Sequence, residues 1–147
     1  MSPDPKHGYY LEDLAVGMFH EVSHTVTEKD VDDFARICGD YNPIHMDEDY
    51  ASKTPFGGRI AHGALTASYI SAILGNDLPG PGAIFMTLEL KFRAPVRIGD
   101  TVIARAEVGD INERRGKVAM KVQCSVAGKV VVKGVAGVMV EKRPVAE

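Results

Sequence analysis

The sequence lacks the features of membrane, secreted and nucleic-acid-binding proteins. No apolar run reaches the roughly 18 residues of a transmembrane helix, and the segment from Met1 to Gly8 lacks the apolar core of a signal peptide. The net charge is −3 and no lysine- and arginine-rich stripe is present, so we expect neither nucleic acid nor a membrane as a partner. The two cysteines, Cys38 and Cys124, lack metal-ligand spacing and lie in apolar patterns. They predict buried free thiols and a reducing, cytoplasmic setting.

The composition that remains is that of one globular domain. Apolar residues make up 45% and charged residues 25% of the 147 residues, which is enough chain to bury a core. Internal repeats, low-complexity tracts and long linkers are absent. We therefore predict a single domain over residues 9–142, with loose tails at residues 1–8 and 143–147.

The first half of the chain predicts a strand followed by an amphipathic helix. The strand is expected near residues 19–26, and Thr27 can cap a helix with Asp30 three residues later. Apolar residues then recur at the spacing of one helical face, at Val31, Phe34, Ala35 and Cys38. Gly39 is a typical helix end, so Asp40 is expected to begin a loop.

A helix of different character is predicted over residues 62–74. It is apolar or small on nearly every face, contains no charge and ends at Gly75. Such a helix must be surrounded by protein, and it is too short to span a membrane. A short helix near Asp47 and a flexible break at residues 54–58 precede it.

The last third of the chain predicts strands. Four apolar stretches, the first three with strict alternation, are residues 84–93, 102–108, 118–126 and 130–140. Alternation at period 2 predicts one buried and one solvent-facing side for each strand, and hairpin turns are expected at residues 112–116 and 127–128. The arrangement that buries all of these faces is an α+β fold, a curved antiparallel sheet wrapped around the apolar helix.

The polar segment after Gly39 carries the strongest candidate for catalysis. Pro43 restricts the backbone and favours an extended Asn42, so a stiff loop can bring Asp40 and His45 together. A carboxylate and a neutral imidazole can hold and polarise one water molecule, and the imidazole can take a proton and return it. Asn42 could orient the water or the carboxylate. The alternative is an ordinary polar turn, because Asp, Asn and Pro favour turns.

The start of the apolar helix, at His62 and Gly63, is the second candidate. The first amides of a helix lack partners and lie at the positive end of its dipole. The Gly63 amide could therefore stabilise a thioester oxygen as it gains negative charge. The alternative is a close-packing glycine beside a capping or core histidine.

Serine and metal chemistry have weaker support. Ser71 lies on the apolar helix, where a hydroxyl usually bonds back to the preceding turn, and no Gly-x-Ser-x-Gly sequence indicates a serine hydrolase. Potential metal ligands without a recognised pattern are His45, Asp47, Asp49 and His62. We expect no metal site.

These residues resemble a known family. Residues 39–47, Gly-Asp-Tyr-Asn-Pro-Ile-His-Met-Asp, resemble the signature of the MaoC-like, (R)-specific enoyl-CoA hydratases. Residues 60–65 resemble that family's helix opening, and residues 92–96 followed by Gly99-Asp100 resemble its strand-to-strand turn. The resemblance extends from about Leu14 to Val140 and implies a hot-dog fold, a homodimer and an acyl-CoA substrate near the subunit interface.

The resemblance also implies roles for individual residues. It gives as catalytic residues Asp40, Asn42, His45 and Gly63, and as substrate-binding residues His62 and Ser71. The carboxylate and imidazole would activate water, Asn42 would support them, and the Gly63 amide would hold the thioester oxygen. The implied reaction is the reversible hydration of a trans-2-enoyl-CoA to the (3R)-3-hydroxyacyl-CoA, in fatty-acid or polyhydroxyalkanoate metabolism. It needs no cofactor, because CoA belongs to the substrate.

Two other functions stay open for this fold. One is an acyl-CoA thioesterase, in which water attacks the carbonyl; the other is a non-catalytic acyl-CoA-binding protein. The acyl chain length and the carrier, CoA or acyl carrier protein, are also open. Basic residues that could meet the carrier's phosphates are Lys53, Arg59, Lys91 and Arg93.

Overall fold

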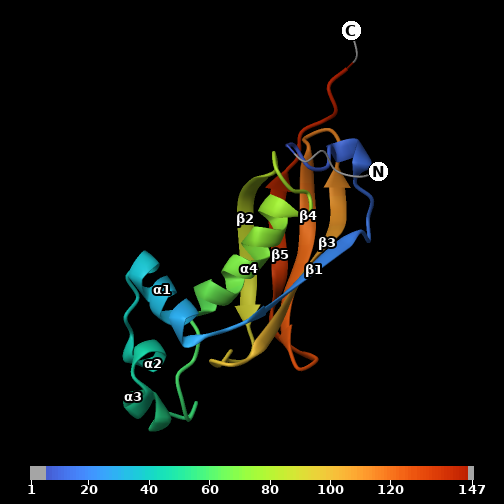
Figure 1. The fold of residues 1–147 in the computed structure, drawn as a ribbon. Coiled ribbons are helices and arrows are strands. Elements are labelled where there is room, and N and C mark those ends of the chain that lie inside the picture. The colour runs from blue at the N-terminus through green and yellow to red at the C-terminus, as the bar shows by residue number, and fades with distance from the viewer. Residues whose placement is uncertain (1–5, 146–147) are drawn as a thin grey trace.

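A computed structural model describes residues 6–145 as an open antiparallel sheet packed against one long helix. The helices are η1 (Leu11–Asp13), α1 (Glu28–Cys38), α2 (Pro43–Met46), α3 (Glu48–Ser52) and α4 (Gly63–Asn76). The strands are β1 (Phe19–Thr25), β2 (Ile84–Phe92), β3 (Thr101–Asn112), β4 (Lys117–Val126) and β5 (Lys129–Met139). Their order in the sheet is β1-β3-β4-β5-β2. Figure 1 shows α4 lying along the sheet, with α1, α2 and α3 grouped beyond its first turn.

The ends of α1 are set by local side-chain chemistry, as predicted. The Thr27 hydroxyl accepts a hydrogen bond from the Asp30 amide at 3.1 Å, and the Asp30 carboxylate accepts one from the Thr27 amide at 3.0 Å. Gly39 ends the helix with a φ of 84°, a left-handed conformation that suits glycine. The prediction that Cys38 is buried is wrong, because the last turn of α1 extends past the buried part of the helix.

The inner strands and their hairpins form as predicted. Buried and exposed residues alternate along β3, β4 and β5, and the alternating residue Cys124 is buried. The turn between β3 and β4 spans Asn112 to Lys117. Between β4 and β5, Ala127 has a φ of 50° and Gly128 a φ of 79°. Two left-handed residues in succession match the twist of a two-residue hairpin.

Helix α4 packs one face against the sheet and leaves its other face open. Its buried residues are Leu65, Thr66, Tyr69, Ile70, Ile73 and Leu74. By contrast, Ala64, Ser71 and Ala72 are exposed. The expectation of a helix surrounded on every side is therefore wrong for the single chain, because an open sheet covers only one side of α4.

Strand β2 forms one edge of the sheet and is exposed along almost its whole length. Alternation predicted one buried face, but even Leu90, the most covered residue, is only half-buried. Its exposed apolar residues are Ile84, Phe85, Met86, Leu88 and Phe92. The prediction fails because alternation indicates that a face is covered without saying which chain covers it. An edge strand with an exposed apolar patch is typical of a protein–protein interface.

The chain ends partly contradict the predicted tails. His7 lies 2.9 Å from the Glu141 carboxylate, and Gly8 is buried. Arg143 donates to the Asp13 carboxylate at 2.7 Å. These residues are therefore held against the domain, whereas residues 1–5 and 146–147 of the predicted tails lie outside the described residues. The boundaries at 9 and 142 stay a prediction. None of the helices between residues 6 and 145 is long and apolar enough to cross a membrane.

Candidate active site

His45 lies on a one-turn helix, α2, and not in the predicted loop. Pro43 occupies the first helical position, where its fixed φ suits a helix and its missing N–H costs nothing. The Asn42 side chain caps the turn by accepting a hydrogen bond from the Ile44 amide at 3.1 Å. The Asp40 carboxylate accepts a hydrogen bond from the backbone N–H of Asn42 at 3.1 Å. Asn42 therefore caps the segment through its side-chain oxygen, and its expected role of orienting water or the carboxylate stays a prediction.

The hydrogen bond of His45 defines which ring nitrogen can act as a base. Nδ1 lies 2.8 Å from the backbone carbonyl oxygen of Ile60, which can only accept, so Nδ1 carries the hydrogen and donates it. In the neutral ring Nε2 is then the unprotonated nitrogen, and it lies 3.8 Å from an Asp40 carboxylate oxygen. That separation is too long for a direct hydrogen bond and suits a shared water molecule. The structure thus brings Asp40 and His45 together as expected.

His62 is buried behind this pair. It is 2% exposed, and its Nε2 donates to the backbone carbonyl of Asp40 at 2.9 Å. Its ring stacks on His45, with 4.0 Å between ring centroids and 28° between the planes. His62 does not line the cavity described below, and its contacts position its neighbours; its substrate-binding role stays a prediction.

Gly63 opens α4 and faces a cavity. A Cβ at this position would lie 2.9 Å from Cε1 of Phe92, so the site accepts only glycine unless that ring moves. The amides of Leu65 and Thr66 bond to the His62 carbonyl, while within residues 6–145 the Gly63 amide has no backbone partner. An unpaired amide at the positive end of a helix is suited to an oxyanion.

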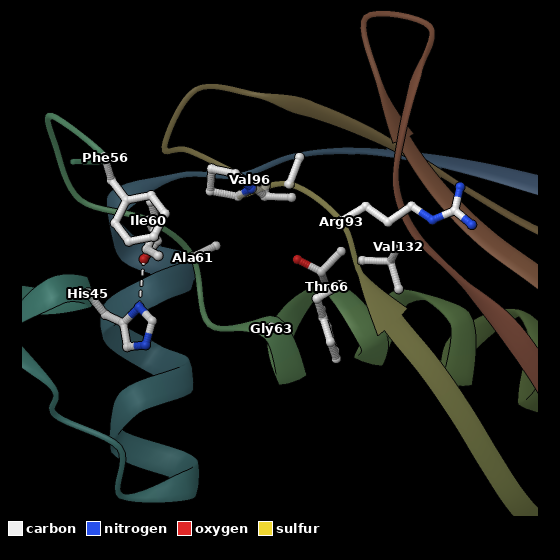
Figure 2. Close-up of a pocket in the computed structure, with 12 residues that line it drawn as sticks. His45, Phe56, Ile60, Ala61, Gly63, Thr66, Arg93, Val96 and Val132 are labelled. Atoms are coloured by element: carbon white, nitrogen blue, oxygen red, sulfur yellow. Dashed lines mark hydrogen bonds between the residues drawn. The ribbon is translucent and has the colours of Figure 1, made fainter.

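The cavity has a volume of about 340 Å³ and runs between His45, the start of α4 and the chain after β2 (Figure 2). Its lining residues are His45, Phe56, Ile60, Ala61, Gly63, Thr66, Phe92, Arg93, Ala94, Pro95, Val96 and Val132. Most are apolar, which suits an acyl chain. The sequence did not single out Phe56, Thr66 or Val132, because only the tertiary fold brings them beside His45.

Ser71, a predicted substrate contact, does not line this cavity in the single chain. It is exposed on the open face of α4.

Cys124 lies behind the cavity wall, where its thiol donates to the Thr66 carbonyl at 3.7 Å. Burial raises the pKa of the Cys124 thiol to about 12, so this cysteine stays a neutral packing residue behind the cavity wall.

A carboxylate and two imidazoles lie close enough together to resemble a metal site, but their contacts disfavour one. Asp40, His45 and His62 each offer a ligand atom within 4.8 Å of the others. However, both imidazoles already donate one nitrogen to a backbone carbonyl. Imidazole lone pairs lie in the ring plane, so two stacked rings do not direct them at one point. The other candidate ligands serve elsewhere, since Asp47 caps α3 and Asp49 pairs with Lys53.

Comparisons with known proteins place the chain among MaoC-like hydratases and dehydratases. Residues 17–130 match the family described as MaoC like domain. The chain is 48% identical over 143 residues to the (R)-specific enoyl-CoA hydratase of Rhodospirillum rubrum, covering 97% of this chain and 99% of that protein. It is 48% identical over 138 residues to the 3-hydroxybutyryl-CoA dehydratase of Methylorubrum extorquens, covering 94% and 88%. The solved (R)-hydratase from A. caviae superposes with a TM-score of 0.86 at 35% identity, covering 88% and 98%.

An antiparallel sheet packed against one long helix, superposing on a solved (R)-hydratase, places this chain in the hot-dog fold class, and the Asp40–His45 pair lies beside the helix start. The predicted fold is thereby confirmed. Within that class, the chain belongs to the MaoC-like domain family.

Proposed function

We propose that this protein is an (R)-specific enoyl-CoA hydratase, which interconverts trans-2-enoyl-CoA and (3R)-3-hydroxyacyl-CoA. One observation carries the proposal: the bond from His45 Nδ1 to Ile60 leaves Nε2 free as a base 3.8 Å from Asp40, at the wall of an apolar cavity. The names and full-length similarity of the relatives support the same reaction.

The proposed chemistry divides between the two halves of the site. His45 Nε2 and the Asp40 carboxylate hold a water molecule, and Nε2 takes its proton as the oxygen bonds to C3 of the substrate. The electrons of the C2–C3 double bond move onto the thioester oxygen, which the Gly63 amide stabilises. In other enzymes, loss of one such donor lowers kcat by roughly 10²–10³. C2 then takes the proton back from His45, so water is added and no cofactor is consumed.

The dimensions of the cavity suggest a short acyl chain. Its volume of about 340 Å³ lies near the lower end of the range for small-molecule sites, roughly 300–1,000 Å³. Phe56 lines it on the side of His45, and Val132 lines it on the side of Thr66 and Arg93 (Figure 2). We therefore infer that four-carbon enoyl thioesters fit better than long ones.

The exposed edge of the sheet supports a homodimer. The apolar residues of β2 and the open face of α4 would both be covered if a second copy paired along β2. Ser71 would then face the partner subunit, where it could reach a substrate held between the two chains. A cytoplasmic location and a role in polyhydroxyalkanoate or fatty-acid metabolism stay predictions.

Hydratase, thioesterase and binding protein can be distinguished by whether the enoyl thioester is hydrated and whether free thiol is released. A hydratase removes the absorbance of the conjugated enoyl thioester without releasing thiol. A thioesterase releases CoA thiol, and a non-catalytic binding protein binds the substrate and does neither. His45 and Gly63 both line the cavity and Asp40 lies 3.8 Å from His45 Nε2, an arrangement of base and oxyanion site that favours hydration.

A further inference from the structure

A second hollow lies on the face of the sheet that points away from α4. It has a volume of about 270 Å³ and is lined by Glu89, Lys91, Arg93, Lys133, Gly134 and Val135. Side chains alternate between the two faces of a strand. Because Val132 is buried toward α4, the exposed Lys133 beside it points to the outer face. We call this hollow the basic groove.

The basic groove holds cations that lack counter-ions. Lys91 and Lys133 are directly paired across β2 and β5, so their like charges face each other. Across the part of the chain that the structure describes, no ion pair joins Lys91, Arg93 or Lys133 to an acidic side chain. Glu89 is the acidic residue in the lining, against three cations. This excess of positive charge stands out in a chain whose net charge is −3.

The other basic candidates for the carrier's phosphates are already occupied. Arg59 pairs with Asp32 at 2.9 Å and also donates to the His45 carbonyl, so it braces α2. Lys53 pairs with Asp49 at 3.4 Å. Of the four candidates from the sequence, Lys91 and Arg93 remain, and the fold adds Lys133 beside them.

Arg93 connects the basic groove to the cavity, because it lines both. Figure 2 shows its side chain extending away from His45 and past Val132, so that its backbone borders the cavity while its guanidinium lies outside. A substrate whose thioester rests at Gly63 can therefore leave the cavity past Arg93 and arrive at the basic groove.

We propose that the basic groove binds the phosphate groups at the nucleotide end of CoA. The inference rests on the proposed function, since it concerns the same substrate. The arginine fork suits a phosphate with two parallel hydrogen bonds, and the lysines act as point charges. Val135, which is 47% exposed, offers an apolar surface for the adenine ring. A compact hollow with three cations fits a nucleotide better than the extended acidic helix of an acyl carrier protein.

The groove stays accessible in the proposed homodimer. Pairing along β2 would use the backbone groups of the strand edge, and the outward side chains of Lys91 and Lys133 would remain on the outer face. The substrate would pass the end of β2 at Arg93, which follows the last strand residue Phe92, so pairing of the strand edge would leave the groove open.

The test compares crotonyl-CoA with crotonyl-pantetheine, which lacks the nucleotide. In Lys133→Glu and Lys91→Glu, kcat/KM for crotonyl-CoA should fall about tenfold or more, the scale of one lost charge-assisted contact, while crotonyl-pantetheine should be unaffected. Lys117→Glu is the matched control, because Lys117 is exposed on the same sheet but pairs with Met139 at its other end. This control should match wild type with both substrates.

Calorimetry with adenosine 3′,5′-bisphosphate tests the groove without catalysis. Wild type and Lys117→Glu should bind it, and Lys133→Glu should not. In the kinetic test, an equal loss of kcat/KM with both substrates in Lys133→Glu, or no loss with crotonyl-CoA, would overturn the proposal. So would a loss seen only when crotonyl-acyl carrier protein is assayed as a third substrate. If wild type hydrates neither substrate, the proposed function fails on its own, and nucleotide binding still decides the role of the groove.

Discussion

The imidazole of His62 donates a hydrogen bond from Nε2 to the backbone carbonyl of Asp40, with 2.9 Å between nitrogen and oxygen. His62 occupies the position just before α4, and Asp40 follows the end of α1. The bond therefore joins the two segments that form the site. The same ring stacks on His45. The relative position of base, carboxylate and oxyanion site therefore depends on one buried side chain that does not line the cavity.

Two variants of His62 should distinguish the contribution of its hydrogen bond to kcat from the contribution of its stacking on His45. His62→Phe keeps a ring beside His45 but leaves the Asp40 carbonyl without a donor, whereas His62→Gln can still donate. We expect His62→Phe to lower kcat by about tenfold or more with little change in KM, because small misplacements of catalytic groups are costly. His62→Gln should retain more activity than His62→Phe. Steady-state kinetics with crotonyl-CoA decide this, and wild-type kcat in both variants would show that His62 only fills space.

Gly63 should be intolerant of a side chain because of Phe92. In Gly63→Ala the new Cβ would lie 2.9 Å from the Phe92 ring, so the ring or the start of α4 must move. We expect kcat/KM to fall by about tenfold or more, since the amide would shift from the thioester oxygen. Phe92→Leu removes the clash, so the double variant should recover activity relative to Gly63→Ala. If the double variant is as impaired as Gly63→Ala, the clash with Phe92 is not the cause.

The edge strand should control assembly. Leu88→Lys places a charge in the exposed apolar patch of β2, and we expect it to shift the protein from dimer to monomer in light scattering after size-exclusion chromatography. Ile103→Lys is the control, because Ile103 is equally exposed on the inner strand β3 and should leave assembly unchanged. A wild-type monomer, or a Leu88→Lys dimer, would contradict the proposed interface.

The cavity volume predicts a preference among acyl chains. With crotonyl-, hexenoyl- and octenoyl-CoA, kcat/KM should fall as the chain lengthens, by about tenfold or more across the series. Phe56→Ala removes an aromatic ring from the cavity lining and should narrow that difference. Equal rates for all three substrates in wild type would mean that the acyl chain occupies a larger space than this cavity.

Local chemistry made much of the site predictable from the sequence. The cap at Thr27, the stop at Gly39 and the rigidity of Pro43 depend on near neighbours, and together they place Asp40 close to His45. The role of His62 could not be predicted in this way, because its partner is a backbone carbonyl 22 residues away. The exposure of β2 was missed because an apolar pattern does not distinguish burial in its own chain from burial against another.

Hydration of crotonyl-CoA by wild type, Asp40→Asn and His45→Ala tests the central claim most directly. The decline of enoyl thioester absorbance is followed together with free thiol and with the chirality of the product. The account predicts (3R)-3-hydroxybutyryl-CoA without thiol release, and at least about a thousandfold lower kcat in either folded variant, because a lost base raises the barrier by several kcal/mol. Thiol release without hydration, or a near wild-type rate in either variant, would contradict it.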